Sequence, residues 1–348
     1  MSKSTKNNSN GFLADIKSTL ILKIIFNHLS KMKSLRIVNH IKKTQNRLNF
    51  RITDYKLFSE TYTPIEIGII PSKNSHGKFI NLLENEESYY HIFFDSNKEE
   101  KKLNYLNEED NISHIKIIID SQIKSFNKLF KNCTIIESIN FKKFYRNNIN
   151  NMSEMFYNCS KLKKINFHNY KTDNVTNMNS MFYECTSLEQ LDLSKFKTEN
   201  VINMSYMFDR CILLQELNLS NFNTNNLKNM SYMFCRCSSL NKLILPCLNK
   251  DKEIDMRYMF YKCKALKDVN IYNFNVIKIS NMNYMFSGCS NELIKKIKSK
   301  YKNLKLEAFF DIWNNSLDER IIMIILYKIN NFLMPLFIIK NNILFLFY

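Results

Sequence analysis

Cysteines spaced at a fixed interval are the first candidates for chemistry in this chain. Seven of the nine cysteines follow one another at intervals of 26 residues: Cys133, Cys159, Cys185, Cys211, Cys237, Cys263 and Cys289. Thiolates can bind a metal ion or pair as disulfides. In a stack of identical coils, however, cysteines one coil apart project in the same direction, which suits neither a disulfide nor a tetrahedral zinc site. We therefore interpret them as small buried apolar residues, and expect no metal and no cofactor.

The remaining residue types do not form an active site either. The six histidines are scattered, and none stands with a second histidine, an acid pair or a nucleophile at a matching position of the 26-residue interval. Only four glycines occur, and neither a GxGxxG nor a Walker sequence is present. The sequence therefore predicts a protein that is not an enzyme.

Each cysteine follows a phrase, Met-x-x-Met-Phe, that opens one unit of a tandem repeat. The phrase begins at Met152, Met178, Met204, Met230, Met256 and Met282, with a degenerate first copy at Phe126. Met178, Met181, Phe182 and Cys185 stand at i, i+3, i+4 and i+7, which is typical of one face of a short helix. Self-similarity at this period predicts stacked repeats.

The rest of the unit predicts a strand and a return loop. Leu191 and Leu193 alternate with polar residues, which indicates a short strand, and Phe196 and Val201 are expected to anchor the loop. A single unit buries too little apolar surface to offset the conformational entropy of its own residues. Neighbouring copies must therefore cover one another, with parallel strands along one side.

A polar column precedes the methionines. It consists of Asn151, Asn177, Asn203, Asn229, Asp255 and Asn281. We interpret these residues as helix N-caps, whose side chains also tie each coil to the next.

The repeated sequence resembles a known family. NMSEMFYNCSKLKKINF, NMNSMFYECTSLEQLDLSKFKTENV and NMSYMFDRCILLQELNLSNFNTNNL resemble the BspA-like leucine-rich repeat family, also called the mycoplasma-lipoprotein-type repeat, over roughly residues 120–310. The resemblance implies a repeat solenoid without an active site. Members of that family are mostly described as surface proteins that adhere to host or matrix proteins. The copy that begins at Leu240 departs from the pattern, because Pro246, Cys247 and Leu248 replace its Ser-x-Phe.

We predict an α/β fold: a leucine-rich-repeat solenoid of seven 26-residue coils, each with a short helix and a short parallel strand. Residues 1–10 are expected to be disordered, 11–119 to form an N-terminal α+β capping domain of helices and a small sheet, and 120–290 to form the solenoid. An amphipathic helix is expected over Glu292 to Phe310 as the C-terminal cap, followed by an apolar tail at 311–348.

The N-terminal segment allows a second interpretation. ILKIIFNHLSKMKSLRIVNHIKKTQNRL faintly resembles an F-box, although the usual Leu-Pro opening and the tryptophan near the end are missing. The resemblance implies an adaptor of a ubiquitin ligase, with the repeats as its substrate receptor. The basic residues from Lys31 to Arg51 and the net charge of +18 favour polyanions. No RNA-binding aromatic signature or zinc-finger spacing accompanies them, so we interpret a solvated helix face and do not expect a nucleic-acid partner.

Location depends on the two ends of the sequence. The apolar run from Leu20 to Phe26 is interrupted by Lys23 and starts too far into the chain for a signal peptide, so we expect a cytoplasmic protein. In the tail from Ile321 to Tyr348 the longest uncharged run has 11 residues, whereas a transmembrane helix needs about 20. The tail could anchor the protein to a membrane, fold onto the body or remain poorly ordered. The family resemblance implies the cell surface as an alternative.

The leading hypothesis is a protein-binding scaffold or adhesion-type protein that uses the strand side of the repeats. Its partner is an unidentified protein, and we expect the chain to be a monomer. The outward strand positions that we expect to bind are Lys164, Asn166, His168, Gln190, Asp192, Ser194, Glu216, Asn218, Ser220, Asp268, Asn270 and Tyr272.

Overall fold

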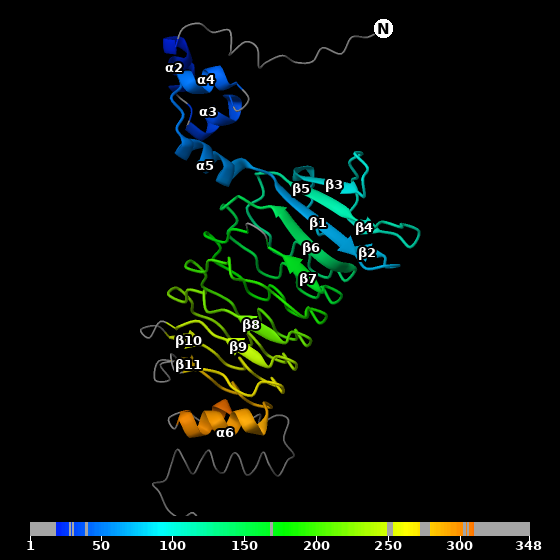
Figure 1. The fold of residues 1–348 in the computed structure, drawn as a ribbon, viewed down its shortest axis with the longest axis vertical. Coiled ribbons are helices and arrows are strands. Elements are labelled where there is room, and N and C mark those ends of the chain that lie inside the picture. The colour runs from blue at the N-terminus through cyan, green and yellow to red at the C-terminus, as the bar shows by residue number, and fades with distance from the viewer. Residues whose placement is uncertain are drawn as a thin grey trace, which may run out of the picture.

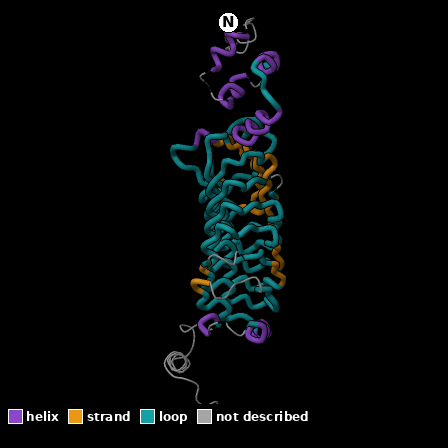
Figure 2. The backbone as a smooth tube through the Cα atoms, turned by 90° about the vertical axis from the view of Figure 1, so that its left-hand side faces the viewer, coloured by secondary structure: helices purple, strands orange, loops and turns teal. Residues whose placement is uncertain are grey.

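The computed structural model describes residues 19–27, 29, 31–38, 41–167, 170–248, 253–271, 279–301, 304 and 306–309. The expectations for residues 1–10 and for the tail at 311–348 lie outside this part of the chain. Figure 1 shows an elongated molecule in which N-terminal helices, a sheet, the stacked repeats and a final helix follow one another along the long axis. Figure 2 shows the stack mostly as loops and turns, with helices near its two ends.

Four helices begin the described chain: α2 (Thr19–Asn27), α3 (Lys31–Val38), α4 (Lys42–Arg47) and α5 (Ile52–Tyr62). Leu22, Phe26 and Val38 form a small core that is separate from the main one. The end of α5 contacts the repeats, because the Glu60 carbonyl accepts a hydrogen bond from the Asn147 N–H at 2.9 Å. The Glu60 carboxylate also lies 2.7 Å from the Lys171 ammonium.

The N-terminal sheet continues into the repeats. Its five strands lie in the order β3 (Tyr90–Phe94), β5 (Ile115–Ile119), β1 (Ile65–Pro71), β6 (Ile136–Lys143) and β7 (Lys164–Asn166). The first four strands pair antiparallel, and β6 pairs parallel with β7. Alternating β-branched isoleucines favour these strands and bury one face of the sheet. β1 therefore covers the edge that the first repeat strand would otherwise expose.

Shorter elements complete the description. In the N-terminal part these are β2 (Gly77–Lys78), β4 (Tyr105–Leu106) and the 3-10 helix η1 (Glu87–Tyr89), and β2 pairs antiparallel with β4. In the repeats, β8 (Glu216–Asn218) pairs parallel with β9 (Lys242–Ile244), and β10 (Ile254–Asp255) pairs parallel with β11 (Ile279–Asn281). The predicted strand at residues 191–193 and the predicted strand positions Asp268 and Asn270 are not assigned as strands.

The predicted short helix in each repeat is wrong. The Met-x-x-Met-Phe segment is a series of turns, closed by bonds such as that from the Met181 N–H to the Met178 carbonyl at 3.3 Å. Alternate N–H groups leave the segment instead: those of Ser180 and Phe182 each donate to the neighbouring copy at 2.9 Å. Ser180 and Glu184 have positive φ angles of 52° and 56°, which an α-helix cannot contain.

The asparagine column makes the expected hydrogen bond in a different structure. The side-chain oxygen of Asn177 accepts from the backbone N–H of Asn179 at 3.0 Å, and that of Asn203 accepts from Ser205 at 2.9 Å. Because these segments are turns, the residues form Asx-type turns rather than helix N-caps. Their backbones form a series of parallel bridges, which joins equivalent residues from Ser125 to Asp255 at intervals of 26.

The last coil is covered by a helix and a short segment that replaces a further repeat. α6 (Asn291–Lys300) is shorter than the predicted Glu292–Phe310 helix, and it buries Leu293 and Ile297. The 3-10 helix η3 (Leu306–Ala308) follows, and the Ala308 carbonyl accepts from the Phe286 N–H at 2.7 Å. No helix among the described residues is both long and apolar enough to cross a membrane.

Candidate binding surface

The strand side of the repeats presents alternating side chains. In β7, β8 and β9 the middle residue is buried and the two flanking residues are exposed. The outward residues of β8 and β9 meet in register, with Glu216 opposite Lys242 and Asn218 opposite Ile244. Each outward side chain is thus fixed by a buried neighbour, as the alternation in the sequence predicted.

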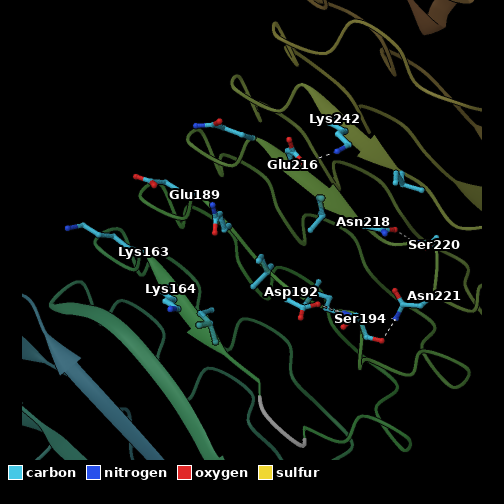
Figure 3. Close-up of a pocket in the computed structure, with 17 residues that line it drawn as sticks. Lys163, Lys164, Glu189, Asp192, Ser194, Glu216, Asn218, Ser220, Asn221 and Lys242 are labelled. Atoms are coloured by element: carbon cyan, nitrogen blue, oxygen red, sulfur yellow. Dashed lines mark hydrogen bonds and ion pairs between the residues drawn. The ribbon is translucent and has the colours of Figure 1, made fainter.

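A shallow pocket of about 950 Å³ lies on this side (Figure 3). It brings together seven of the predicted residues: Lys164, Gln190, Asp192, Ser194, Glu216, Asn218 and Ser220. Asn166, Asp268 and Asn270 are exposed but do not line it. The predicted residues His168 and Tyr272 lie outside the described part of the chain.

Hydrogen bonds within the surface hold its polar groups in place. The Asp192 carboxylate accepts from the Ser194 N–H at 2.9 Å, and this bond lowers the pKa of the Asp192 carboxyl. The Asn218 side-chain oxygen accepts from the Ser220 N–H at 3.0 Å. The Asn221 amide donates to the carbonyls of Leu193 and Phe196, at 3.1 and 3.0 Å. The polar groups therefore keep defined positions on the coils.

Charges of both signs line the pocket in equal number. Three are basic and three are acidic: Lys163, Lys164, Lys242, Glu189, Asp192 and Glu216. Lys242 lies 3.1 Å from Glu216 on the neighbouring coil, and Lys163 lies 3.0 Å from Glu137. These pairs are exposed and contribute little to stability. They do set a fixed pattern of charge toward solvent.

Comparison with known proteins identifies the family. Residues 124–245 and 213–316, together more than half of the chain, match the family model described as "Mycoplasma protein of unknown function, DUF285". The chain belongs to this family. No curated protein matches it. The crystal structure of a leucine-rich repeat protein from Eubacterium ventriosum ATCC 27560 matches with 20% identity, over 45% of the DUF285 chain and 41% of the other, with a TM-score of 0.26.

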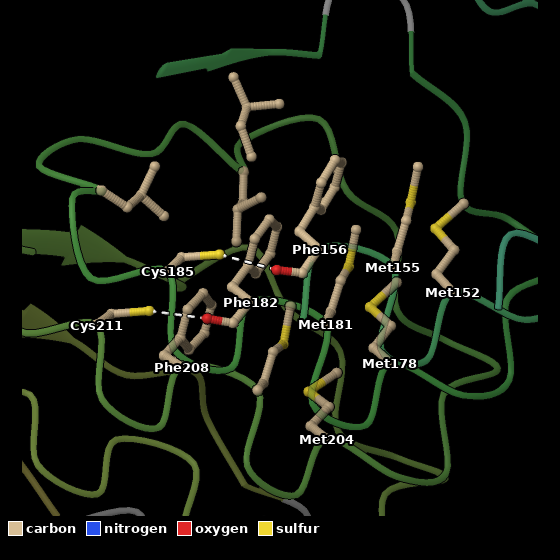
Figure 4. Close-up of a cluster of buried hydrophobic side chains, with 14 of the residues drawn as sticks. Met152, Met155, Phe156, Met178, Met181, Phe182, Cys185, Met204, Phe208 and Cys211 are labelled. Atoms are coloured by element: carbon tan, nitrogen blue, oxygen red, sulfur yellow. Dashed lines mark hydrogen bonds between the residues drawn. The ribbon is translucent and has the colours of Figure 1, made fainter. Parts of the chain in front are cut away.

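The thiols of this DUF285 protein form an interior column (Figure 4). All seven cysteines of the column are buried, which confirms their interpretation as small buried residues. The Cys185 thiol donates to the Phe156 carbonyl and the Cys211 thiol donates to the Phe182 carbonyl, each at 3.1 Å. Burial raises the pKa of these thiols well above the usual value. In the described part of the chain, no three His, Cys, Asp or Glu side chains converge on a possible metal site.

Phenylalanine rings fill the space beside the thiols. Phe156, Phe182, Phe208 and Phe234 stack in sequence, with ring centroids 5.5 to 5.6 Å apart and nearly parallel planes. Each of these rings is fully buried. A close-packed column of this kind holds the outward strand residues at a constant offset from one coil to the next.

Some residues of the pocket were missed by the sequence argument. Lys163, Glu189 and Gln215 occupy the same position in three successive copies, just before the strand, and all line the pocket. Their shared polarity was a usable signal. Asn221 lies on the return loop, where the sequence analysis singled out no binding residue. Leu191, which was expected inside the strand, is only half-buried.

Proposed function

We propose that this DUF285 chain is a non-enzymatic protein-binding scaffold with BspA-like leucine-rich repeats. In this proposal seven 26-residue coils form a solenoid, and the strand-side surface defined by the pocket binds a partner protein. The observation that carries the proposal is the pocket itself, in which polar side chains of successive coils are held by hydrogen bonds over a packed core. A surface fixed before binding loses less entropy when the partner docks.

The charge pattern favours a protein over a nucleic acid. A phosphate backbone binds best to a surface of one sign, because release of counterions drives its association. Here three acidic side chains stand among three basic ones. Such a mixed surface complements the mixed charges of a folded protein and selects among partners.

The solenoid part of the proposal is supported by the regular offset between copies. The parallel bridges from Ser125 to Asp255 all join residues 26 apart. Both ends of the column carry covering segments, β1 at one end and α6 with η3 at the other. Repeat proteins need such terminal covers, because an end coil otherwise exposes its apolar face.

Capture from a cell extract tests the proposal with the full-length protein. The binding variant carries Asp192→Lys and Asn218→Lys. The matched control carries Glu199→Lys and Ile202→Lys, which add the same charge at exposed positions that do not line the pocket. Proteins retained by the wild type and the control but lost from the binding variant support the proposal. Equal retention by all three proteins, or equal loss from both variants, contradicts it.

A second function is favoured by the N-terminal helices. Leu20, Ile21 and Ile37 are 69%, 50% and 47% exposed, although these helices have a core of their own. Contiguous exposed apolar patches are typical of protein-binding sites, and these three side chains are available to contribute to one. This supports the F-box-like adaptor as the alternative proposal. Binding of a purified Skp1-type protein to the wild type but not to an Ile21→Asp/Ile37→Asp variant tests it, and an absence of binding refutes it.

A further inference from the structure

A ladder of tyrosines runs along the turn segments of the repeats. Tyr206, Tyr232, Tyr258 and Tyr284 occupy the same position on four successive copies, and all are half-buried. Consecutive ring centroids are 4.4, 4.5 and 4.7 Å apart. Because the rings stack on one another, the faces of the inner rings are covered. A partner can therefore reach ring edges but cannot stack on the inner ring faces.

A row of cations accompanies the ladder. Arg210, Arg236 and Lys262 stand immediately before the cysteine on three successive copies. In the described part of the chain Arg236 and Lys262 form no ion pair, and their charges lie 5.5 and 4.9 Å from the ring centroid of Tyr261. Adjacent parallel strands lie about 5 Å apart. Like charges at the same position of adjacent coils therefore repel each other unless an anion lies between them.

The charges on these segments are sorted by depth. Glu184, the partner of Arg210, is 24% exposed, whereas Arg210 is 40% exposed. Asp255 is 21% exposed and its partner Arg257 is 47% exposed. Asp209, whose carboxylate lies near Arg236, is only 2% exposed. The acidic groups thus lie beneath the cations, and an approaching molecule meets a predominantly positive layer.

We propose that the tyrosine ladder and the row Arg210, Arg236 and Lys262 form a second docking surface, which binds an acidic segment of a polypeptide laid along the stack. Its carboxylates would neutralise the repulsion within the row. Tyrosine and arginine are also, with tryptophan, the residues enriched at the energetic centres of protein interfaces. A single-stranded nucleic acid fits less well. Its bases bind proteins by stacking on exposed aromatic faces, and the faces of the inner tyrosines are covered.

This surface is separate from the strand-side pocket. None of the ladder or row residues lines that pocket, and the buried columns of Met, Phe and Cys belong to the segment that carries the ladder. The inference therefore does not depend on the function proposed above. The full-length protein can be tested for both surfaces independently.

Binding of a fluorescein-labelled poly-L-glutamate of about 20 residues tests the inference, measured by fluorescence anisotropy at low and physiological salt. The wild type is expected to bind the peptide, and Arg236→Glu/Lys262→Glu to weaken binding at least tenfold. Arg236→Gln/Lys262→Gln, which adds no negative charge, is expected to weaken it about threefold and guards against a folding defect of the first variant. The matched control is Lys98→Glu/Lys195→Glu, which reverses two exposed charges outside both the row and the pocket.

Three results would overturn the inference. The first is a wild type that does not bind poly-L-glutamate. The second is an equal loss in the control, which would show that the net charge of +18 alone attracts the peptide. The third is a sulfated polysaccharide that binds through Arg236 and Lys262 when poly-L-glutamate does not. A control within twofold of the wild type, together with the expected losses in the row variants, supports it.

Discussion

Asp209 provides the sharpest test of how the turn segments tolerate charge. The residue is 2% exposed, and its Oδ1 atom has no hydrogen-bond partner among the residues that the structure describes. Burial raises the pKa of the carboxyl from 3.8 to about 6, although a hydrogen bond with Cys235 and the charges of Arg236 and Arg210 act in the opposite direction. The desolvated carboxylate therefore destabilises the fold at neutral pH.

The magnitude follows from the difference between the folded and unfolded states. A shift of the pKa from 3.8 to about 6 corresponds to about 3 kcal/mol, at about 1.4 kcal/mol per unit. The folded state binds the proton more tightly, so the contribution of Asp209 to stability is most favourable below pH 4 and is lost as the pH rises through about 6. Asp209→Asn replaces the carboxylate by a neutral group of the same shape. At pH 7.5 we expect the variant to be more stable by about 1 to 3 kcal/mol.

Urea denaturation at a series of pH values from 3 to 7.5 measures this difference. We expect the gap between variant and wild type to be largest at pH 7.5 and to close below pH 4. Glu189→Gln removes an exposed carboxylate and serves as the control, with an expected change within about 0.5 kcal/mol. Equal stability of Asp209→Asn and the wild type at pH 7.5, or a gap that is independent of pH, would refute the argument.

Three other predictions concern the packing of the repeats. Phe208→Ala removes a ring from the buried stack and is expected to cost about 3 to 5 kcal/mol of unfolding free energy by urea titration; a cost below 1 kcal/mol would mean that the stack is not close-packed. Leu217→Ala is expected to lower the unfolding free energy by about 2 to 5 kcal/mol, because this side chain is 3% exposed, and Asn218→Ala to lower it by less than about 0.5 kcal/mol, because Asn218 faces solvent. Equal effects of the two variants in thermal melts would contradict the assignment of Leu217 to the interior and Asn218 to the surface. With a thiol reagent, the exposed Cys247 is expected to react rapidly and the buried cysteines only after unfolding, and rapid reaction of several thiols in the native protein would contradict their burial.

The sequence was sufficient to predict which side chains face inward. The 26-residue interval placed Met178, Phe182 and Cys185 in buried columns, and all three are fully buried. The alternation around Leu217 placed Glu216 and Asn218 outward, where the structure has them. These features depend on the chemistry of individual positions repeated many times, which the sequence records directly.

The local backbone was not predictable in the same way. Apolar residues at i, i+3, i+4 and i+7 lie on one side of a helix, and they also lie on one side of successive turns. Hydrogen bonds between copies, such as that from the Phe182 N–H to the Met207 carbonyl, stabilise the turns instead of a helix. Ser180 and Glu184 adopt positive φ angles although neither is glycine, and the position before the cysteine is a glycine in one copy alone, at Gly288.

The candidate surfaces, too, were predictable from the sequence only in part. Exposure of the strand residues followed from periodicity, but the pocket also needed Asn221 from the return loop, whose position depends on bonds to the preceding copy. Aligning the copies would have revealed the tyrosine ladder. The depth of Asp209 beneath Arg236 could not be inferred, because it depends on how two neighbouring coils pack.

Distances between paired nitroxide labels test most directly whether successive 26-residue units stack in register. One label replaces Lys164, and the second replaces Glu216, Lys242 or Asp268 in three separate proteins in which the exposed Cys247 is changed to serine. Electron paramagnetic resonance should give separations that increase by about 5 Å with each added unit, to roughly 20 Å for the last pair. Separations that do not increase in equal steps, or that exceed twice these values, would contradict the stacked arrangement.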